Sequence, residues 1–222
     1  MKSISSVINA RLSSTRVPEK LIRQFAGTSL IEIALEKLNR MDSFEHRFLA
    51  VADEALKDIG RRYKNVEILS RRKKAVRKGV NPQKITFAHY CNVPSDYILV
   101  FNPCLPLVSI ETIKMAVNYF QENHYPSYTS VIKTGDWVFD AMGNPVTNTD
   151  PSNLTTNKAV QFYKAAHAFH IITKDRFIKE GLHWSFTLDD PHMVEIPENE
   201  YFDIDTEYEF RLAESLYSES LK

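Results

Sequence analysis

Short apolar runs alternate with segments of helical periodicity through the first half of the chain. Residues 4–8 have the length of a buried strand, and the same pattern predicts strands at 48–52, 66–69 and 97–101. The 97–101 run is the most strand-like in the chain and is expected at the centre of a sheet.

Helix signals fill the gaps between these runs. Leu30 and Leu38 belong to an apolar series at helical spacing, and Ser29 with Glu32 resembles a capping box at its start. Further helices are predicted over 55–63 and from Ser109 to about residue 122. This order predicts an α/β fold with a mostly parallel sheet flanked by helices.

The second half of the chain is less regular. Residues 128–133 alternate like a strand, 137–145 read as a hairpin turn, and a polar loop covers 147–158. We therefore expect a small excursion from the main sheet near 125–165. His167 and His170 lie on a later strand, where the spacing i and i+3 places them on opposite faces, so a shared zinc ion is not expected.

Composition limits the number of domains and the class of protein. The 222 residues fit a single domain over 1–222, and 28 basic against 28 acidic residues argue against a nucleic-acid-binding protein. Neither a membrane-spanning run nor a signal-peptide pattern is present, and Cys91 and Cys104 have no metal-binding spacing. A cytoplasmic location with reduced thiols is expected, without a membrane partner.

The segment that follows the first strand is rich in cations and hydroxyls. It carries Arg11, Arg16 and Lys20 together with Ser13 and Ser14, and it contains no glycine. A polar loop in this place can direct N–H groups and cations at a polyphosphate, but it is neither a Walker A loop nor a GxGxxG motif. From the residues alone, a solvated basic turn is an equal alternative.

Acidic residues stand out near the C-terminal end. Asp203 and Asp205 are two positions apart, so in an extended segment both carboxylates face one side, an arrangement that suits Mg²⁺. Thr206 and Glu209 form a capping box for a final helix. The alternative is that both aspartates only favour the positive end of that helix.

Both of these segments resemble the sugar-acid cytidylyltransferases, which include the acylneuraminate (CMP-sialic acid) synthetases and the KDO cytidylyltransferases. The opening motif reads Ala10-Arg11-x-x-Ser14-Thr15-Arg16-x-Pro18-x-Lys20, and the closing one reads Asp203-Ile204-Asp205-Thr206 followed by Ala213-Glu214. The resemblance implies a Rossmann-like nucleotidyltransferase domain. Arg11, Arg16 and Lys20 would be its catalytic cations, Ala10, Ser13 and Ser14 would join Arg11 and Lys20 in binding the nucleotide, and Asp203 and Asp205 would bind Mg²⁺.

The middle of the chain departs from the family pattern. Asn102-Pro103-Cys104-Leu105-Pro106-Leu107 resembles the turn of the sialic-acid branch, with Cys104 and Leu105 in place of its polar pair, and Asn102 could bind the nucleotide. Arg71 opens a run of six cations over 71–78, which is either a solvated face or a lid over the triphosphate. The resemblance implies that Arg71 helps to hold the nucleotide. His167 and His170 fall where the family binds its sugar.

The resemblance implies an enzyme that couples CTP to a small acidic sugar of the sialic-acid or KDO type, releasing pyrophosphate. Mg²⁺ would be the cofactor, and a homodimer is implied only through the family. Two alternatives remain open: a nucleotide-binding homologue with impaired catalysis, and a nucleotidyltransferase for a different acceptor.

Overall fold

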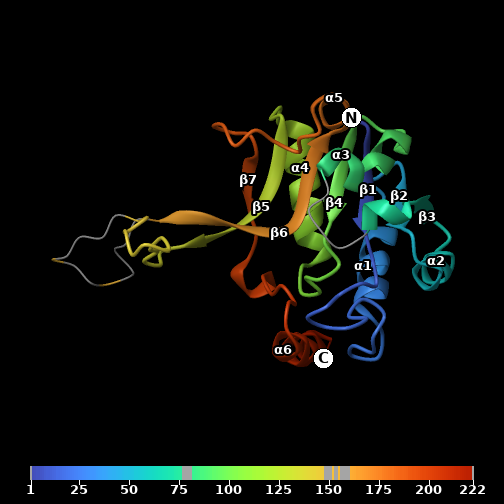
Figure 1. Ribbon diagram of the computed structural model, residues 1–222, viewed down its shortest axis with the longest axis horizontal. Coiled ribbons are helices and arrows are strands. Elements are labelled where there is room, and N and C mark those ends of the chain that lie inside the picture. The colour runs from blue at the N-terminus through green and yellow to red at the C-terminus, as the bar shows by residue number, and fades with distance from the viewer. Residues whose placement is uncertain (1, 77–81, 148–151, 153–154, 156–160, 222) are drawn as a thin grey trace.

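A computed structural model of the chain describes residues 2–76, 82–147, 152, 155 and 161–221 (Figure 1). Its strands form a seven-stranded sheet in the order β3-β2-β1-β4-β6-β5-β7. Only β6 runs antiparallel to its neighbours, so the predicted α/β fold with a mostly parallel sheet is confirmed. The strands are β1 Ile4–Asn9, β2 Arg47–Val51, β3 Glu67–Ser70, β4 Tyr97–Phe101, β5 Ser127–Thr134, β6 Phe162–Thr173 and β7 His192–Glu195.

Helices cover both faces of this sheet. Ser29 and Ser109 begin the two helices predicted for them, each accepting a hydrogen bond from the backbone N–H three residues later. The α-helices are α1 Leu30–Asn39, α2 Glu54–Gly60, α3 Gln83–Thr86, α4 Ile110–Glu122, α5 Lys174–Glu180 and α6 Glu207–Ser220. The sequence pattern did not predict β7, α3 or α5, which are short elements without clear periodicity.

The sheet separates two apolar layers. Leu99 and Phe101 of β4 face the larger layer, which includes buried residues of α1, α4 and α6, whereas Ile98 faces the smaller one beside Tyr90 and Phe177. Successive side chains of a strand point to opposite faces, so a strand covered on both sides must be apolar throughout. This explains the continuous apolar run at β4.

The predicted excursion is a two-stranded arm. Beyond the end of β7, residues 132–134 of β5 pair only with 162–164 of β6, and in Figure 1 this pair projects away from the sheet. The arm therefore begins later than the predicted residue 125, because the first half of β5 is part of the main sheet. The predicted hairpin turn is confirmed by an antiparallel bridge between Phe139 and Pro145.

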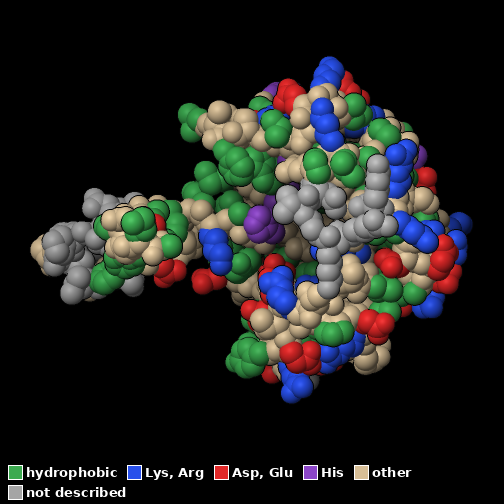
Figure 2. Space-filling view, in the orientation of Figure 1, with side chains coloured by type: hydrophobic (Ala, Val, Ile, Leu, Met, Phe, Trp, Pro, Cys, Tyr) green, Lys and Arg blue, Asp and Glu red, His purple; other side chains and the backbone are tan. Residues whose placement is uncertain are grey.

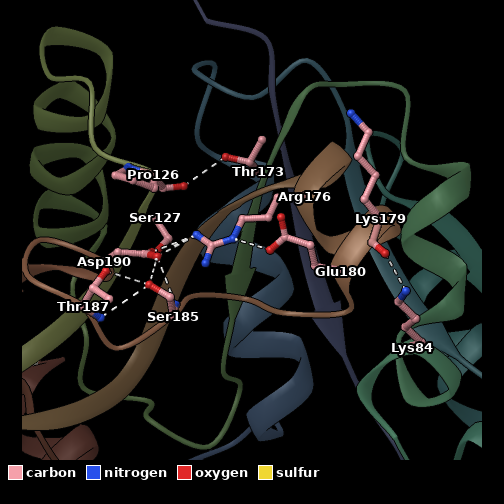
Figure 3. Close-up of polar contacts among 10 residues, drawn as sticks. All are labelled: Lys84, Pro126, Ser127, Thr173, Arg176, Lys179, Glu180, Ser185, Thr187 and Asp190. Atoms are coloured by element: carbon pink, nitrogen blue, oxygen red, sulfur yellow. Dashed lines mark hydrogen bonds and ion pairs between the residues drawn. The ribbon is translucent and has the colours of Figure 1, made fainter.

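A buried carboxylate anchors the loop that follows α5. Asp190 accepts hydrogen bonds from the hydroxyls of Ser127 and Ser185 and pairs with Arg176 at 2.8 Å, and Figure 3 shows these side chains converging from β5, the loop and α5. These donors hold the pKa of Asp190 below its ordinary value despite its burial. The loop is thereby fixed against the end of the sheet.

None of the helices in the described part of the chain is long and apolar enough to cross a membrane.

Candidate active site

A cavity of about 240 Å³ opens where β1 and β4 end. These strands are neighbours in the sheet and run parallel, so their carboxyl ends lie at the same edge. The loop after β1 supplies one wall and the turn after β4 the other. The cavity is lined by Asn9, Arg11, Ser13, Ser14, Thr15, Arg16, Lys20, Leu21, Asn102, Pro103 and Cys104.

Most of the predicted nucleotide-binding residues meet at this cavity, but Ala10 and Arg71 do not line it. The side chain of Ala10 is buried in the core, and its N–H donates to the carbonyl oxygen of Ala50. The backbone N–H of Ala10 is therefore used in pairing with β2.

The two ends of the chain meet at the same place. The guanidinium of Arg16 lies 2.7 Å from a carboxylate oxygen of Asp205, and Nζ of Lys20 lies 3.8 Å from that oxygen. Lys20 also donates a hydrogen bond to the carbonyl oxygen of Ile204, whose N–H donates to Cys104. The cations of the first motif therefore contact the acidic segment of the second.

Asp203 has the environment of a carboxylate that needs a cation. Burial raises its pKa, and the charge of Asp205 raises it further, while Lys20 and His167 oppose this effect. Within the described residues, its carboxylate accepts no hydrogen bond and forms no ion pair. A partly buried carboxylate without donors is unfavourable unless a positive charge completes its surroundings.

Asp203 and Asp205 fit a hard cation. Both are oxygen ligands, and Mg²⁺ commonly takes one or two carboxylates together with phosphate oxygens and water. No cluster of three His, Cys, Asp or Glu suited to a metal occurs in the described ranges. The two aspartates would therefore hold Mg²⁺ only as part of a complex with phosphates.

Helix α6 fixes the backbone of this acidic segment. Thr206 and Glu209 form the predicted capping box, and the Glu209 carboxylate also accepts the N–H of Asp205 at 2.8 Å. Glu207 pairs with Arg23 through two hydrogen bonds of 2.7 Å. These contacts fasten the start of α6 to the segment after β1.

The turn after β4 keeps its shape through Asn102 and Cys104. The side-chain oxygen of Asn102 accepts the N–H of Cys104 at 3.0 Å, which leaves its amide NH₂ group for a ligand. Burial raises the pKa of the Cys104 thiol, and the nearby Lys20 partly offsets this effect. The thiol is therefore neutral and apolar in character at the cavity wall.

Arg71 lies directly after β3 and is almost fully buried. It donates to the carbonyl oxygen of Thr86, and its Nε has no partner among the described residues. Burial lowers its pKa, and the charge of Arg11 adds to this effect. Lys73–Val76 forms a 3₁₀ turn, whereas Arg77 and Lys78 lie outside the described residues, so the lid stays a prediction.

The expected geometry of the two histidines was wrong. The rings of His167 and His170 are 5.5 Å apart rather than on opposite faces. A register shift in the pairing of β5 with β6 interrupts the alternation here, and His167 adopts a φ of +55°. The bulge turns the backbone and brings both rings to one side.

Their environments differ. His167 is exposed, and it contributes to lowering the pKa of Asp203. His170 bonds to the hydroxyl of Thr129 at 2.8 Å and packs against Trp184, and burial lowers its pKa to about 3. Figure 2 shows histidine side chains on this face close to the base of the arm.

Sequence reasoning missed three residues beside the cavity. Asn9 lines it and bonds to the buried side chains of His89 and Tyr90. Asn9 could have been suspected, because a polar residue that ends a buried strand faces the functional edge of a parallel sheet. Nothing in the sequence around His89 and Tyr90 indicates that they approach β1.

Comparison with known proteins gives the family of this chain. The family model described as cytidylyltransferase matches residues 6–193, and the chain belongs to that family. It is similar to the 3-deoxy-manno-octulosonate (KDO) cytidylyltransferases of Rickettsia felis and Rickettsia akari, at 23% and 21% identity over 168 residues. The aligned part covers 74% of this chain and 64% of either relative.

Two solved structures share the fold. One is a CMP:2-keto-3-deoxy-manno-octonic acid synthetase complexed with CTP, with a TM-score of 0.72, 12% identity, and coverage of 99% of this chain and all of that one. The other is a 4-diphosphocytidyl-2C-methyl-D-erythritol synthase from Anaerococcus prevotii, with a TM-score of 0.68, 16% identity, and coverage of 96% and 95%.

Proposed function

We propose that the protein is a CTP-dependent cytidylyltransferase that couples CTP to an acidic sugar of the KDO or sialic-acid type and releases pyrophosphate. The observation that carries this proposal is the pairing of Asp205 with Arg16 and Lys20, two of the cations that line the cavity. Membership of the cytidylyltransferase family supports the use of CTP. The two KDO cytidylyltransferases support a sugar acid as acceptor.

The reaction places a sugar hydroxyl on the α-phosphate of CTP. Negative charge then grows on the phosphoryl oxygens and on the departing pyrophosphate, so catalysis depends on positioning and on cations aimed at that charge. Arg11, Arg16 and Lys20 would stabilise this charge. The hydroxyls of Ser13 and Ser14 would donate hydrogen bonds to phosphate oxygens, and the NH₂ group of Asn102 would donate to the nucleotide.

Asp203 and Asp205 would hold Mg²⁺, which supplies positive charge to the phosphate oxygens when it is bound. The exposed ring of His167, near Asp203, would contact the acceptor. His170 would support the ring of His167 from the inner side, since its own ring is held against Thr129 and Trp184.

The direct test is pyrophosphate release from CTP and Mg²⁺ in the presence of KDO, sialic, legionaminic or pseudaminic acid. Release with one acid would establish the reaction and name the acceptor. Stabilisation by CTP in a thermal shift without any release would favour a nucleotide-binding homologue or another acceptor. Failure of both assays would refute the proposal.

Asp205→Asn tests the metal role. Loss of the charge should lower Mg²⁺-dependent turnover by about 100-fold, because a group that stabilises transition-state charge is worth that order of magnitude. Circular dichroism should show an unchanged fold, and Asp42→Asn, at another exposed aspartate, should keep full turnover. Wild-type turnover in Asp205→Asn would contradict the metal assignment.

A further inference from the structure

Asn9 is the last residue of β1, and its amide is held from behind by two core residues. Its Nδ2 donates to the hydroxyl of Tyr90 at 2.8 Å, and its Oδ1 lies 2.8 Å from Nε2 of His89. Tyr90 is fully buried and His89 is 6% exposed, so neither side chain can turn away to solvent. The amide is therefore fixed in orientation by partners that a ligand does not reach.

Both partners are neutral. Burial lowers the pKa of His89 to about 3, and the charge of Arg71 contributes to this, while burial raises the pKa of Tyr90. With the Nε2–H tautomer of His89, Oδ1 of Asn9 accepts from the imidazole and Nδ2 donates to the Tyr90 hydroxyl, so this orientation of the amide satisfies both buried partners. An amide can make four hydrogen bonds, so one N–H and one lone pair of Asn9 remain for the cavity.

The cavity is lined by charged and by neutral polar side chains. Lys20 lies near Asp205 and Cys104, and Arg16 pairs with the same carboxylate, so these cations can face phosphates. Asn9 lines the same cavity with a neutral amide whose two partners are also neutral, and such groups suit the hydrogen-bonding edge of a nucleobase.

The side chain of Arg71 gives a second observation that points to a ligand near Asn9 and its two partners. Arg71 is 9% exposed, its Nε is buried without a hydrogen-bond partner among the described residues, and its charge acts on both His89 and Tyr90. A buried donor without an acceptor is costly and is rarely left unpaired. A base with acceptor atoms bound close by would reduce this cost.

We propose that Asn9 contacts the pyrimidine base and selects cytosine over uracil, with His89 and Tyr90 as the residues that position its amide. This inference rests on the proposed use of a nucleoside triphosphate. Cytosine presents the acceptor N3 beside the N4 amino donor, whereas uracil presents the donor N3–H beside the acceptor O4. An amide that cannot rotate can offer its N–H to N3 and its oxygen to N4 of cytosine. The same amide would set donor against donor and acceptor against acceptor with uracil, and this is the physical basis for selecting cytosine.

The test is a set of binding measurements that needs no acceptor sugar. Isothermal titration gives the dissociation constants of CTP, UTP and inorganic tripolyphosphate for the wild type and for Asn9→Ala. We expect Asn9→Ala to weaken CTP binding about tenfold, the size of one to two lost hydrogen bonds. UTP and tripolyphosphate should change little, so the preference for CTP over UTP collapses.

Tyr90→Phe tests the positioning role, with Tyr128→Phe as the matched control. Both tyrosines are buried and hydroxyl-bonded, but Tyr128 accepts its hydrogen bond from Tyr125, away from the cavity. Tyr90→Phe should reduce the CTP preference while Tyr128→Phe leaves it unchanged, even if both lower the melting temperature equally.

The outcomes separate the two proposals. A wild type that binds no nucleoside triphosphate would overturn the proposed function and this inference with it. A wild type that prefers CTP, with an undiminished preference in Asn9→Ala, would overturn the inference alone. An undiminished preference in Tyr90→Phe would overturn the positioning role of the buried pair.

Discussion

At the residue scale, the ionised carboxylate of Asp203 lowers the free energy of unfolding while it provides a ligand for the proposed metal. Its carboxylate is partly buried, lies beside Asp205, and accepts no hydrogen bond within the described residues. The raised pKa means that the folded chain holds this proton more tightly than the unfolded chain does. The group therefore destabilises the fold increasingly as the pH rises through the ordinary and then the raised pKa.

Asp203→Asn removes that charge. At pH 7 without metal, the variant should melt at a higher temperature than the wild type, yet its Mg²⁺-dependent turnover should fall by about 100-fold. Differential scanning calorimetry and pyrophosphate release measure the two effects. The exposed Asp96→Asn is the control and should change neither. A lower melting temperature in Asp203→Asn would contradict the unfavourable environment of its carboxylate.

At the element scale, α6 is the helix that joins the C-terminal motif to the N-terminal loop. Phe210 packs edge-on against Phe25 at 5.2 Å between ring centres, and Glu207 holds Arg23. The sequence predicted the start of this helix because the capping box involves residues only three positions apart. Its partners on the segment after β1 could not be predicted, since Arg23 lies 184 positions from Glu207 and Phe25 lies at a similar distance along the chain from Phe210.

Thr206→Ala tests the cap. Loss of the side-chain acceptor for the Glu209 N–H should lower the free energy of unfolding by about 1 kcal/mol, while Thr206→Ser, which keeps the hydroxyl, should cost much less. Urea denaturation followed by circular dichroism measures both. Equal losses in the two variants would show that the methyl group, not the hydrogen bond, stabilises the helix start.

At the scale of the whole molecule, one buried and two half-buried histidines make stability depend on pH. Burial lowers the pKa of His89 and His170 to about 3 and that of His183 to about 4, whereas in the unfolded chain each is near 6.5. As the pH falls below 6.5 the unfolded state gains protons that the folded state does not bind. Stability is therefore lost from about pH 6.5 downward.

We expect the free energy of unfolding to fall between pH 7.5 and pH 5.5 by about 1 kcal/mol for each of these histidines. Urea denaturation at the two pH values measures it. His183→Phe, which keeps an aromatic ring against Phe87 and Phe177, should remove one such contribution. His124→Gln, at an exposed position, should leave the decrease unchanged, and the same decrease in His183→Phe would contradict the assignment.

The sequence by itself determined most of the elements and the two end motifs. Apolar periodicity located β1 to β5, and Ser29, Ser109 and Thr206 marked helix starts. The end motifs supplied the cations and carboxylates proposed for the site. These features depend on residues a few positions apart. The single domain, the homodimer and the cytoplasmic location stay predictions.

Only the tertiary structure decided which of these residues meet. Arg16 and Asp205 are 189 positions apart, and Asn9 is hydrogen-bonded to His89, which lies 80 positions away. The bulge that places His167 beside His170 depends on how β6 pairs with β5. Local periodicity carries no information about such pairings, because they result from the packing of whole elements against one sheet.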